Sequence, residues 1–211
     1  GKQYKHYKLS VNDLPTQQFP NLNSLHIEDN GHIWVTGKNG YIFKYNTFQD
    51  TFDLVLSASD SIDSKKRLPF THTNLDKSNH LWLCTKNKQY IYHTLNGTFT
   101  QLESPIQREV NYIAQGKGNQ YFIGTNNNVY IAELYDNQLS VKTDSLLENF
   151  HVIQHLYYHE PTKSLVIGTL MDGFYVYNQT NRTLENIGNM KDVTINAITP
   201  AYHSNDKILI A

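Results

Sequence analysis

The sequence predicts an all-β protein made of repeated four-stranded antiparallel sheets. Among its 211 residues are 15 tyrosines and 9 phenylalanines but only 2 methionines, a composition that favours strands over helices. Short apolar or aromatic segments alternate with turns rich in Asn, Asp and Gly along the whole chain. One such segment returns at a nearly constant spacing, which indicates a repeat architecture.

The recurring segment is a short strand between two polar turns. Its copies are "IWVTG" at 33–37, "LWLCT" at 81–85, "YFIGT" at 121–125, "LVIGT" at 165–169 and "ILIA" at 208–211. Taking Trp34, Trp82, Phe122, Val166 and Leu209 as equivalent gives spacings of 48, 40, 44 and 43 residues. An alternating strand precedes each copy, and an aromatic strand and a fourth strand follow the first four copies. These equivalent positions are expected to fill the space between adjacent sheets.

Four short antiparallel strands every 40 to 48 residues are typical of a β-propeller blade. The expected boundaries are an outermost strand at 4–9, blades at about 22–58, 69–103, 110–143 and 152–187, and a partial blade at 193–211. This amounts to a partial propeller of about four full blades plus two incomplete ones. Because unpaired strand edges tend to associate, we expect the chain to be part of a longer propeller. A closed ring of five blades, completed by the N-terminal strand, is the alternative.

The segment "LNSLHIEDNGHIWVTGKNGYIFKYNTFQDTF" at 22–52 resembles the two-component regulator propeller repeat. That repeat has an alternating strand, D-x-x-G-x-L-W-V-G-T, a turn with Gly, a strand ending in Y-N and a later Phe. The matching residues are Asp29, Gly31, Ile33, Trp34, Val35, Gly37, Gly40, Tyr45, Asn46 and Phe52. Later copies keep less of the pattern, and the copy at 165–178 retains Gly168, Thr169, Gly173, Tyr177 and Asn178.

This resemblance implies a periplasmic sensor region of a membrane-spanning histidine kinase, as in the hybrid systems of gut Bacteroidetes that detect glycan fragments. In that family the kinase, phosphoacceptor and DNA-binding modules lie downstream of the propellers, and these residues contain none of them. The resemblance therefore implies a non-catalytic sensor segment of an inner-membrane protein, which takes part in ligand sensing and signal relay. The partners that it implies are an oligosaccharide, neighbouring propeller or sensor domains of the same polypeptide, and a second copy of the chain as a homodimer.

The charge balance and hydropathy exclude several other partners. Lys plus Arg is 18 and Asp plus Glu is 19, so there is no net positive charge to hold nucleic acid. No apolar run approaches the roughly 18 residues that span a bilayer, and the first ten residues lack the apolar core of a signal peptide. We therefore expect no nucleic acid partner and no direct membrane insertion. The single cysteine, Cys84, is expected to be a small buried hydrophobe.

Polar side chains in the turns after the second strands are the candidate ligand contacts. They are Lys38, Asn39, Lys86, Asn87, Asn126, Asn127 and Asp172. We expect them on the same face as the long interblade loops at 10–21 and 57–69, where loops commonly carry binding sites. Amide and charged side chains hydrogen-bond sugar hydroxyls. The structural alternative is that Asn occupies these turns because tight turns require positive φ.

Catalytic and metal sites are less well supported. His151, His155 and His159 are four residues apart in a predicted strand, which places neighbours about 13 Å apart, too far to share zinc. Glu109 and Asp172 are available carboxylates for glycoside hydrolysis, but their surroundings mark neither one. No catalytic residue, metal or cofactor is therefore expected. A protein-interaction platform is the alternative function, and a glycan-active enzyme is the third.

Overall fold

The computed structural model describes residues 4–7, 9, 21–57, 69–188, 190, 192–200 and 208–211. The expected long loops at 10–21 and 57–69 lie almost wholly outside these residues. The chain divides into two compact units, which are described separately. The first contains Gly1–Thr85 and Tyr92–Phe99, and the second contains Lys86–Ile91 and Thr100–Ala211.

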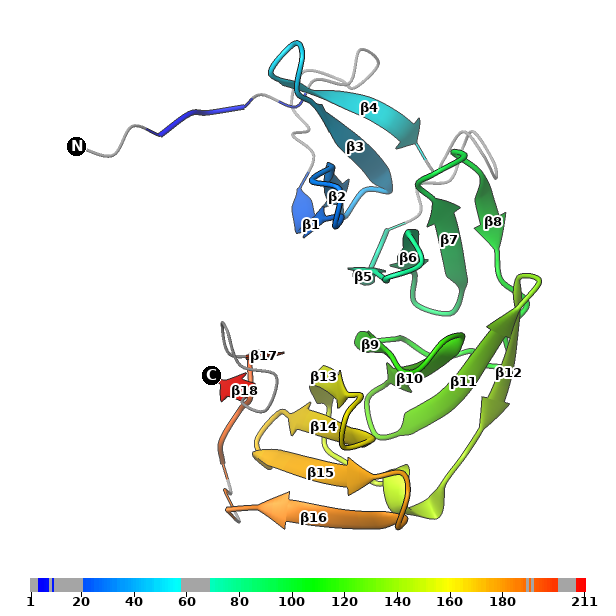
Figure 1. Ribbon diagram of the computed structural model, residues 1–211, viewed down its shortest axis with the longest axis vertical. Helices are drawn as coiled ribbons and strands as arrows, with labels where there is room; N and C mark the ends of the chain where they lie inside the picture. The colour runs from blue at the N-terminus through cyan, green and yellow to red at the C-terminus, as the bar shows by residue number, and fades with distance from the viewer. Residues whose placement is uncertain are drawn as a thin grey trace. The chain divides into compact units, whose positions relative to one another are not determined.

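The described residues form four four-stranded sheets and one two-stranded sheet (Figure 1). The first two sheets are β1 (Leu22–Ile27), β2 (Ile33–Gly37), β3 (Tyr41–Asn46) and β4 (Thr51–Ser57), followed by β5 (His72–Leu75), β6 (His80–Cys84), β7 (Gln89–His93) and β8 (Phe99–Gln101). The next two are β9 (Tyr112–Gln115), β10 (Gln120–Gly124), β11 (Val129–Tyr135) and β12 (Gln138–Lys142), followed by β13 (Ile153–His159), β14 (Ser164–Thr169), β15 (Phe174–Asn178) and β16 (Thr183–Ile187). In each sheet the strands follow one another in chain order, so each sheet is an antiparallel meander built from one repeat.

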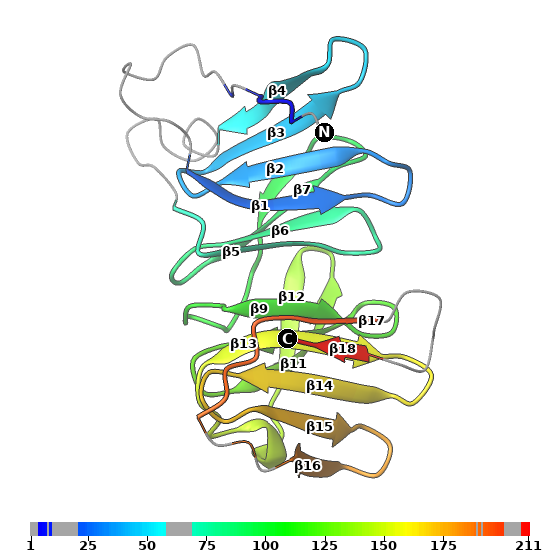
Figure 2. The same cartoon turned by 90° about the vertical axis from the view of Figure 1, so that its left-hand side faces the viewer.

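The C-terminal residues form a two-stranded sheet of β17 (Ile198–Pro200) and β18 (Ile208–Ile210). Strand β17 lies beside β13 of the preceding sheet (Figure 2). A short 3-10 helix, η1 (Ser145–Leu147), lies between β12 and β13 and is the helical element of the described residues. The class is therefore all-β, as predicted.

In the second unit, one glycine in each second strand allows the next repeat to pack closely. A Cβ atom on Gly124 would lie 2.5 Å from Ile153 Cγ2, and one on Gly168 would lie 2.7 Å from Ile195 Cγ2. The following threonine carbonyls accept hydrogen bonds from the same two isoleucines, at 3.2 Å for Ile153 and 3.0 Å for Ile195. The repeated Gly-Thr pair is thus a contact between successive sheets.

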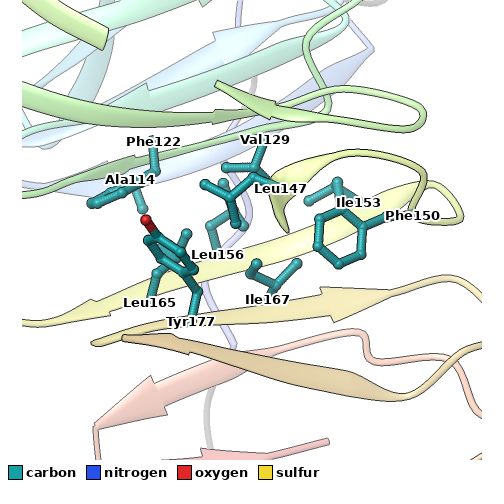
Figure 3. Packing of buried hydrophobic residues seen from close by; sticks show 10 residues of the cluster. All are labelled: Ala114, Phe122, Val129, Leu147, Phe150, Ile153, Leu156, Leu165, Ile167 and Tyr177. Carbon is teal, nitrogen blue, oxygen red and sulfur yellow. The ribbon is translucent and has the colours of Figure 1, made fainter. Parts of the chain in front are cut away.

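An apolar cluster fills the space between the sheets β9–β12 and β13–β16 (Figure 3). Its members are Ala114, Phe122, Val129, Leu147, Phe150, Ile153, Leu156, Leu165, Ile167 and Tyr177. They come from the first three strands of both sheets and from the segment that contains η1. Burial of apolar area of this kind is the main force that holds one repeat against the next.

Four of the five positions aligned across the repeats are core residues, as expected. Trp34, Trp82, Phe122 and Val166 are all buried. The fifth, Leu209, is 59% exposed, so its expected burial is wrong. It lies in β18, where the sheet has only two described strands. Cys84 is fully buried, as expected, and burial raises the pKa of its thiol.

One buried acid stabilises the turn before each tryptophan. In the first repeat this acid is Glu28 and not Asp29, which was matched to the repeat pattern. Asp29 is exposed, whereas Glu28 is buried and accepts a 3.0 Å hydrogen bond from Trp34 Nε1. In the next repeat Asp76 accepts the same bond from Trp82 Nε1, also at 3.0 Å. The acid therefore lies six residues before Trp in both repeats, which identifies Glu28 as the equivalent of Asp76.

The expected outer strand at 4–9 is not a strand in its described residues, 4–7 and 9. A strand requires a hydrogen-bonded neighbour, and the described residues provide none for this segment. Instead Tyr7 packs edge-on against Phe52 and Tyr45 in the first sheet, with ring centroids 5.4 and 5.9 Å apart. Its hydroxyl donates a 2.7 Å hydrogen bond to Asp50 Oδ1. Side-chain packing, and not a backbone ladder, attaches this segment.

Candidate functional site

Three loops of the second unit converge on one polar hollow of about 430 Å³. They are the turn after β6, the segment before β9 and the turn after β10. The lining residues are Lys86, Asn87, Gln107, Arg108, Glu109, Asn126 and Asn127. All of these side chains are polar or charged, so the hollow suits a ligand that forms hydrogen bonds.

A second hollow of about 480 Å³ adjoins the first, because Asn87 and Gln107 line both. Its other lining residues are Lys88, Gln89, Gln101, Leu102, Glu103 and Ser104. We call the two hollows together the polar groove. Two adjoining hollows have room for an extended ligand.

Hydrogen bonds fix several amide groups of the polar groove. Asn111 Nδ2 donates to Asn126 Oδ1 at 3.0 Å, and Arg108 Nη1 lies 3.4 Å from Asn127 Oδ1. The Asn127 carbonyl also accepts a 3.0 Å bond from the Phe150 amide, which ties this turn to the segment after η1. A ligand would therefore meet amides that are already oriented, which lowers the entropy cost of binding.

Two cations of the first hollow, Lys86 and Arg108, can contact a ligand. In the part of the chain that the structure describes, no carboxylate lies within 4 Å of Lys86 Nζ or of the Arg108 guanidinium. Both side chains are exposed. Glu109 is the single carboxylate of the first hollow, so that hollow has a net positive charge.

Gln89 is a groove residue that the sequence did not identify. It is 1% exposed, and its Nε2 donates a 3.2 Å hydrogen bond to the Ile106 carbonyl. Its Oε1 has no hydrogen-bond partner among the described residues. A buried acceptor without a donor is unfavourable, by about 1–3 kcal/mol. The only hint in the sequence is an amide directly before the buried run Tyr90–Tyr92.

Four of the seven predicted contacts meet in the groove and three do not. Lys86 and Asn87 follow β6, and Asn126 and Asn127 follow β10. Lys38 and Asn39 belong to the first unit, and Asp172 follows β14 in the second. Gln107 and Arg108 line the hollow but were not predicted, because the segment before β9 lacks a turn motif.

Positive φ does not explain the asparagines of these turns. Among the described residues, those with positive φ include Gly40 at 85° and Met171 at 78°. They do not include Asn39, Asn87, Asn126 or Asn127. The structural alternative, that asparagine is present to adopt left-handed backbone, therefore fails for the four asparagines.

The three histidines weighed as zinc ligands each have a separate partner. His155 Nε2 lies 2.7 Å from the Tyr112 hydroxyl, His159 Nδ1 lies 2.7 Å from Thr162 Oγ1, and His151 Nε2 lies 3.4 Å from Asp172 Oδ2. Burial lowers the pKa of His155 to about 4 and raises the pKa of Tyr112 to about 12. In the described ranges, no group of three His, Cys, Asp or Glu side chains is placed to hold a metal ion.

Glu109 and Asp172 are not brought together as a catalytic pair in the groove. Glu109 lines the first hollow, whereas Asp172 does not. Among the described residues, no helix is both long and apolar enough to cross a membrane.

Comparison with solved structures identifies the fold. The chain is similar to the extracellular domain of the system BT4673 from B. thetaiotaomicron, described as a hybrid two-component system, with 16% identity and a TM-score of 0.69. That match covers 97% of this chain and 27% of the other. The corresponding domain of BT3049 from the same organism has 16% identity, a TM-score of 0.66 and coverages of 90% and 27%. The chain thus spans about a quarter of these extracellular domains.

A third similar structure is the β-propeller domain of Cps50 (Swd1) from Myceliophteria thermophila. It is 9% identical, has a TM-score of 0.65, and covers 92% of this chain and 62% of that one. No family model matches the chain, and no curated protein matches it. The four meander sheets and these neighbours together establish a partial β-propeller, similar in fold to extracellular domains of two-component systems.

Proposed function

We propose that this chain is a non-catalytic extracytoplasmic segment of a two-component signalling protein, and that it senses a ligand in the polar groove. The observation that carries the proposal is that Lys86, Asn87, Asn126 and Asn127, from turns of two different repeats, line one hollow. The fold supports it, since similar structures that cover nearly the whole chain are extracellular domains of such systems.

The proposed ligand is an oligosaccharide, such as a glycan fragment. Each sugar hydroxyl both donates and accepts a hydrogen bond, and each amide of the groove offers two N–H donors and one carbonyl acceptor. The two adjoining hollows provide room for more than one sugar unit. Lys86 and Arg108 add charged donors, which form stronger hydrogen bonds than neutral ones.

The proposed relay runs to a downstream histidine kinase through neighbouring propeller or sensor domains of the same polypeptide, and through a second copy of the chain. A ligand shifts a conformational equilibrium only by its difference in affinity for the two states. Relay therefore requires that the groove change shape when those neighbours move. A periplasmic location follows from the same proposal.

Calorimetric titration of the chain with a panel of defined neutral and acidic oligosaccharides tests the function. We expect at least one of them to bind, and the double variant Asn87→Ala/Asn126→Ala to weaken that binding about tenfold or more, which corresponds to about 1.4 kcal/mol. Asn39→Ala is the matched control, because Asn39 lies in the equivalent turn of the first unit.

Two results would count against this function. If the double variant binds as tightly as the original chain, the groove is not the sensing site. If chromatography of the mixture shows that the oligosaccharide is shortened with time, the chain is an enzyme and the non-catalytic assignment fails.

A further inference from the structure

A separate hollow of about 460 Å³ lies at the other end of β10, also within the second unit. The polar groove lies beyond Gly124, where β10 ends, whereas this hollow is lined by Gln120, where β10 begins. It also contains two tyrosines, Tyr135 and Tyr158. We call it the tyrosine pocket.

A chain of hydrogen bonds fixes the polar side of the tyrosine pocket. The Tyr158 hydroxyl donates to Gln179 Oε1 at 3.1 Å, and Gln179 Nε2 donates to Gln120 Oε1 at 3.1 Å. These bonds assign the orientation of both amides. They leave the N–H groups of Gln120 Nε2, which has no acceptor among the described residues, able to donate to a ligand.

Packing holds the same side chains in place. The Tyr158 ring stacks on Phe122, with centroids 5.2 Å apart and an interplanar angle of 29°. A Cβ atom on Gly116 would lie 2.8 Å from Gln120 Oε1, so the Gln120 amide occupies space that only glycine leaves open. The polar side of the pocket is therefore preorganised.

Tyr135 provides an exposed aromatic surface in the same pocket. It is the last residue of β11 and is 58% exposed. An exposed ring presents an apolar face to solvent beside polar groups, and covering that face is favourable. The C–H groups of a sugar ring form an apolar face of similar size, while its hydroxyls point outward.

The charges of the tyrosine pocket balance, which disfavours an ionic ligand. Two carboxylates, Glu133 and Glu160, and two lysines, Lys117 and Lys163, line it. The first hollow of the polar groove differs from the tyrosine pocket, because it has two cations, one carboxylate and no aromatic side chain. The two sites therefore suit different ligand chemistry.

We propose that the tyrosine pocket is a second binding site, distinct from the polar groove, that takes an uncharged sugar unit. Tyr135 packs against the apolar face of the sugar, and the fixed Gln120 and Gln179 amides hydrogen-bond its hydroxyls.

Calorimetric titration of the chain with maltohexaose, cellohexaose, xylohexaose and mannohexaose tests the second site, with tetragalacturonate as the charged comparison. We expect at least one neutral probe to bind more tightly than tetragalacturonate. Tyr135→Ala is expected to weaken that binding at least tenfold, and Gln179→Leu to weaken it as well. Tyr135→Phe keeps the ring and is expected to retain the affinity.

Two controls separate this site from the rest of the molecule. Phe48→Ala removes an aromatic side chain that is 95% exposed and lies in the first unit, so it should leave the affinity unchanged. Asn87→Ala/Asn126→Ala alters only the groove and should also leave it unchanged. Because Tyr135 is exposed, its removal is expected to leave the unfolding temperature unchanged, which thermal unfolding verifies.

Three results would overturn the second site. One is that none of the neutral probes binds. Another is that Tyr135→Ala binds the best neutral probe as tightly as the original chain. The third is that Asn87→Ala/Asn126→Ala loses the binding of the neutral probe and Tyr135→Ala does not. That result would support the polar groove as the sensing site and would show that the tyrosine pocket is not a binding site.

Discussion

At the scale of single residues, Glu28 and Asp76 determine the geometry of the turn before each tryptophan. Glu28 accepts from the Trp34 indole and lies 3.0 Å from His32 Nδ1, and Asp76 lies 3.1 Å from His80 Nδ1. Asp76 Oδ1 also accepts bonds from the Ser78 and His80 amides, at 2.8 and 2.9 Å. One carboxylate thus orients a buried indole, a histidine and the turn backbone.

Removing this carboxylate is expected to destabilise the first unit. Asp76→Ala leaves the buried Trp82 Nε1 and two backbone amides without their acceptor, so we expect a loss of about 1–3 kcal/mol or more in the free energy of unfolding. Urea denaturation followed by tryptophan fluorescence measures it. The control is Asp29→Ala, which alters an exposed acid and should change stability by less than about 0.5 kcal/mol. If Asp29→Ala destabilised the fold as much as Asp76→Ala, the assignment of Glu28, and not Asp29, as the equivalent of Asp76 would be contradicted.

Burial also alters the carboxylate of Glu28. Desolvation alone would raise its pKa, but hydrogen bonds from Thr94, Asn30, His32 and Trp34 outweigh that effect and lower it. A lowered pKa in the folded state means that the ionised form stabilises the fold above the ordinary pKa of the group. That contribution is lost as the pH falls through the folded-state pKa.

At the scale of elements, the Gly-Thr pair at the end of a second strand sets the distance between successive sheets in the second unit. Any side chain at Gly124 would meet Ile153, the first residue of β13, and any side chain at Gly168 would meet Ile195, which lies three residues before β17. The corresponding residue of the second repeat, Cys84, is small and fully buried. Small residues recur at this position because the next sheet packs directly on it.

Gly168→Ala is expected to destabilise the second unit by about 1–3 kcal/mol, because the added methyl group overpacks the contact with Ile195 and Ile198. The double variant Gly168→Ala/Ile198→Val should recover part of the loss, since it removes Ile198 Cδ1, which would lie 3.2 Å from the added Cβ atom. Chemical denaturation of the single and double variants measures both effects. Ser140→Ala, on an exposed position of β12, serves as the control. A neutral Gly168→Ala would show that the sheets are not in close contact at this point.

Most strands follow from the sequence because their determinants are local. Alternating apolar residues and glycine turns mark β2, β6, β10 and β14 without reference to the rest of the chain. The segment at 4–9 has a similar alternation, yet its described residues form no strand. A strand depends on a hydrogen-bonded neighbour, which alternation alone does not supply.

At the scale of the whole molecule, two partly buried histidines are expected to make the fold sensitive to acid. Burial lowers the pKa of His26 to about 4 and that of His155 to about 4. An unfolded histidine has a pKa near 6.5, so the unfolded chain binds more protons than the folded chain between about pH 6.5 and 4. Stability is therefore lost as the pH falls through that window.

Unfolding temperatures measured from pH 7.5 to 4 test this dependence. Each histidine contributes a slope of at most about 1.4 kcal/mol per pH unit, reduced by solvent screening because both rings are partly exposed. His26→Gln cannot be protonated and should flatten the profile, whereas the exposed control His6→Gln should not. A profile that is flat from pH 6.5 to 4 in the original chain would contradict the burial of neutral imidazoles.

The repeat, the all-β class and the polar turns can be predicted from the sequence, because alternation and turn chemistry act over a few residues. Which of these turns lie together depends on how the sheets pack. Lys86 and Asn87 share a hollow with Asn126 and Asn127, whereas Lys38 and Asn39, in the same kind of turn, do not line it. The packing of one sheet on the next brings distant segments together, and this also places Gln89 and Tyr135 in hollows that no local pattern marks.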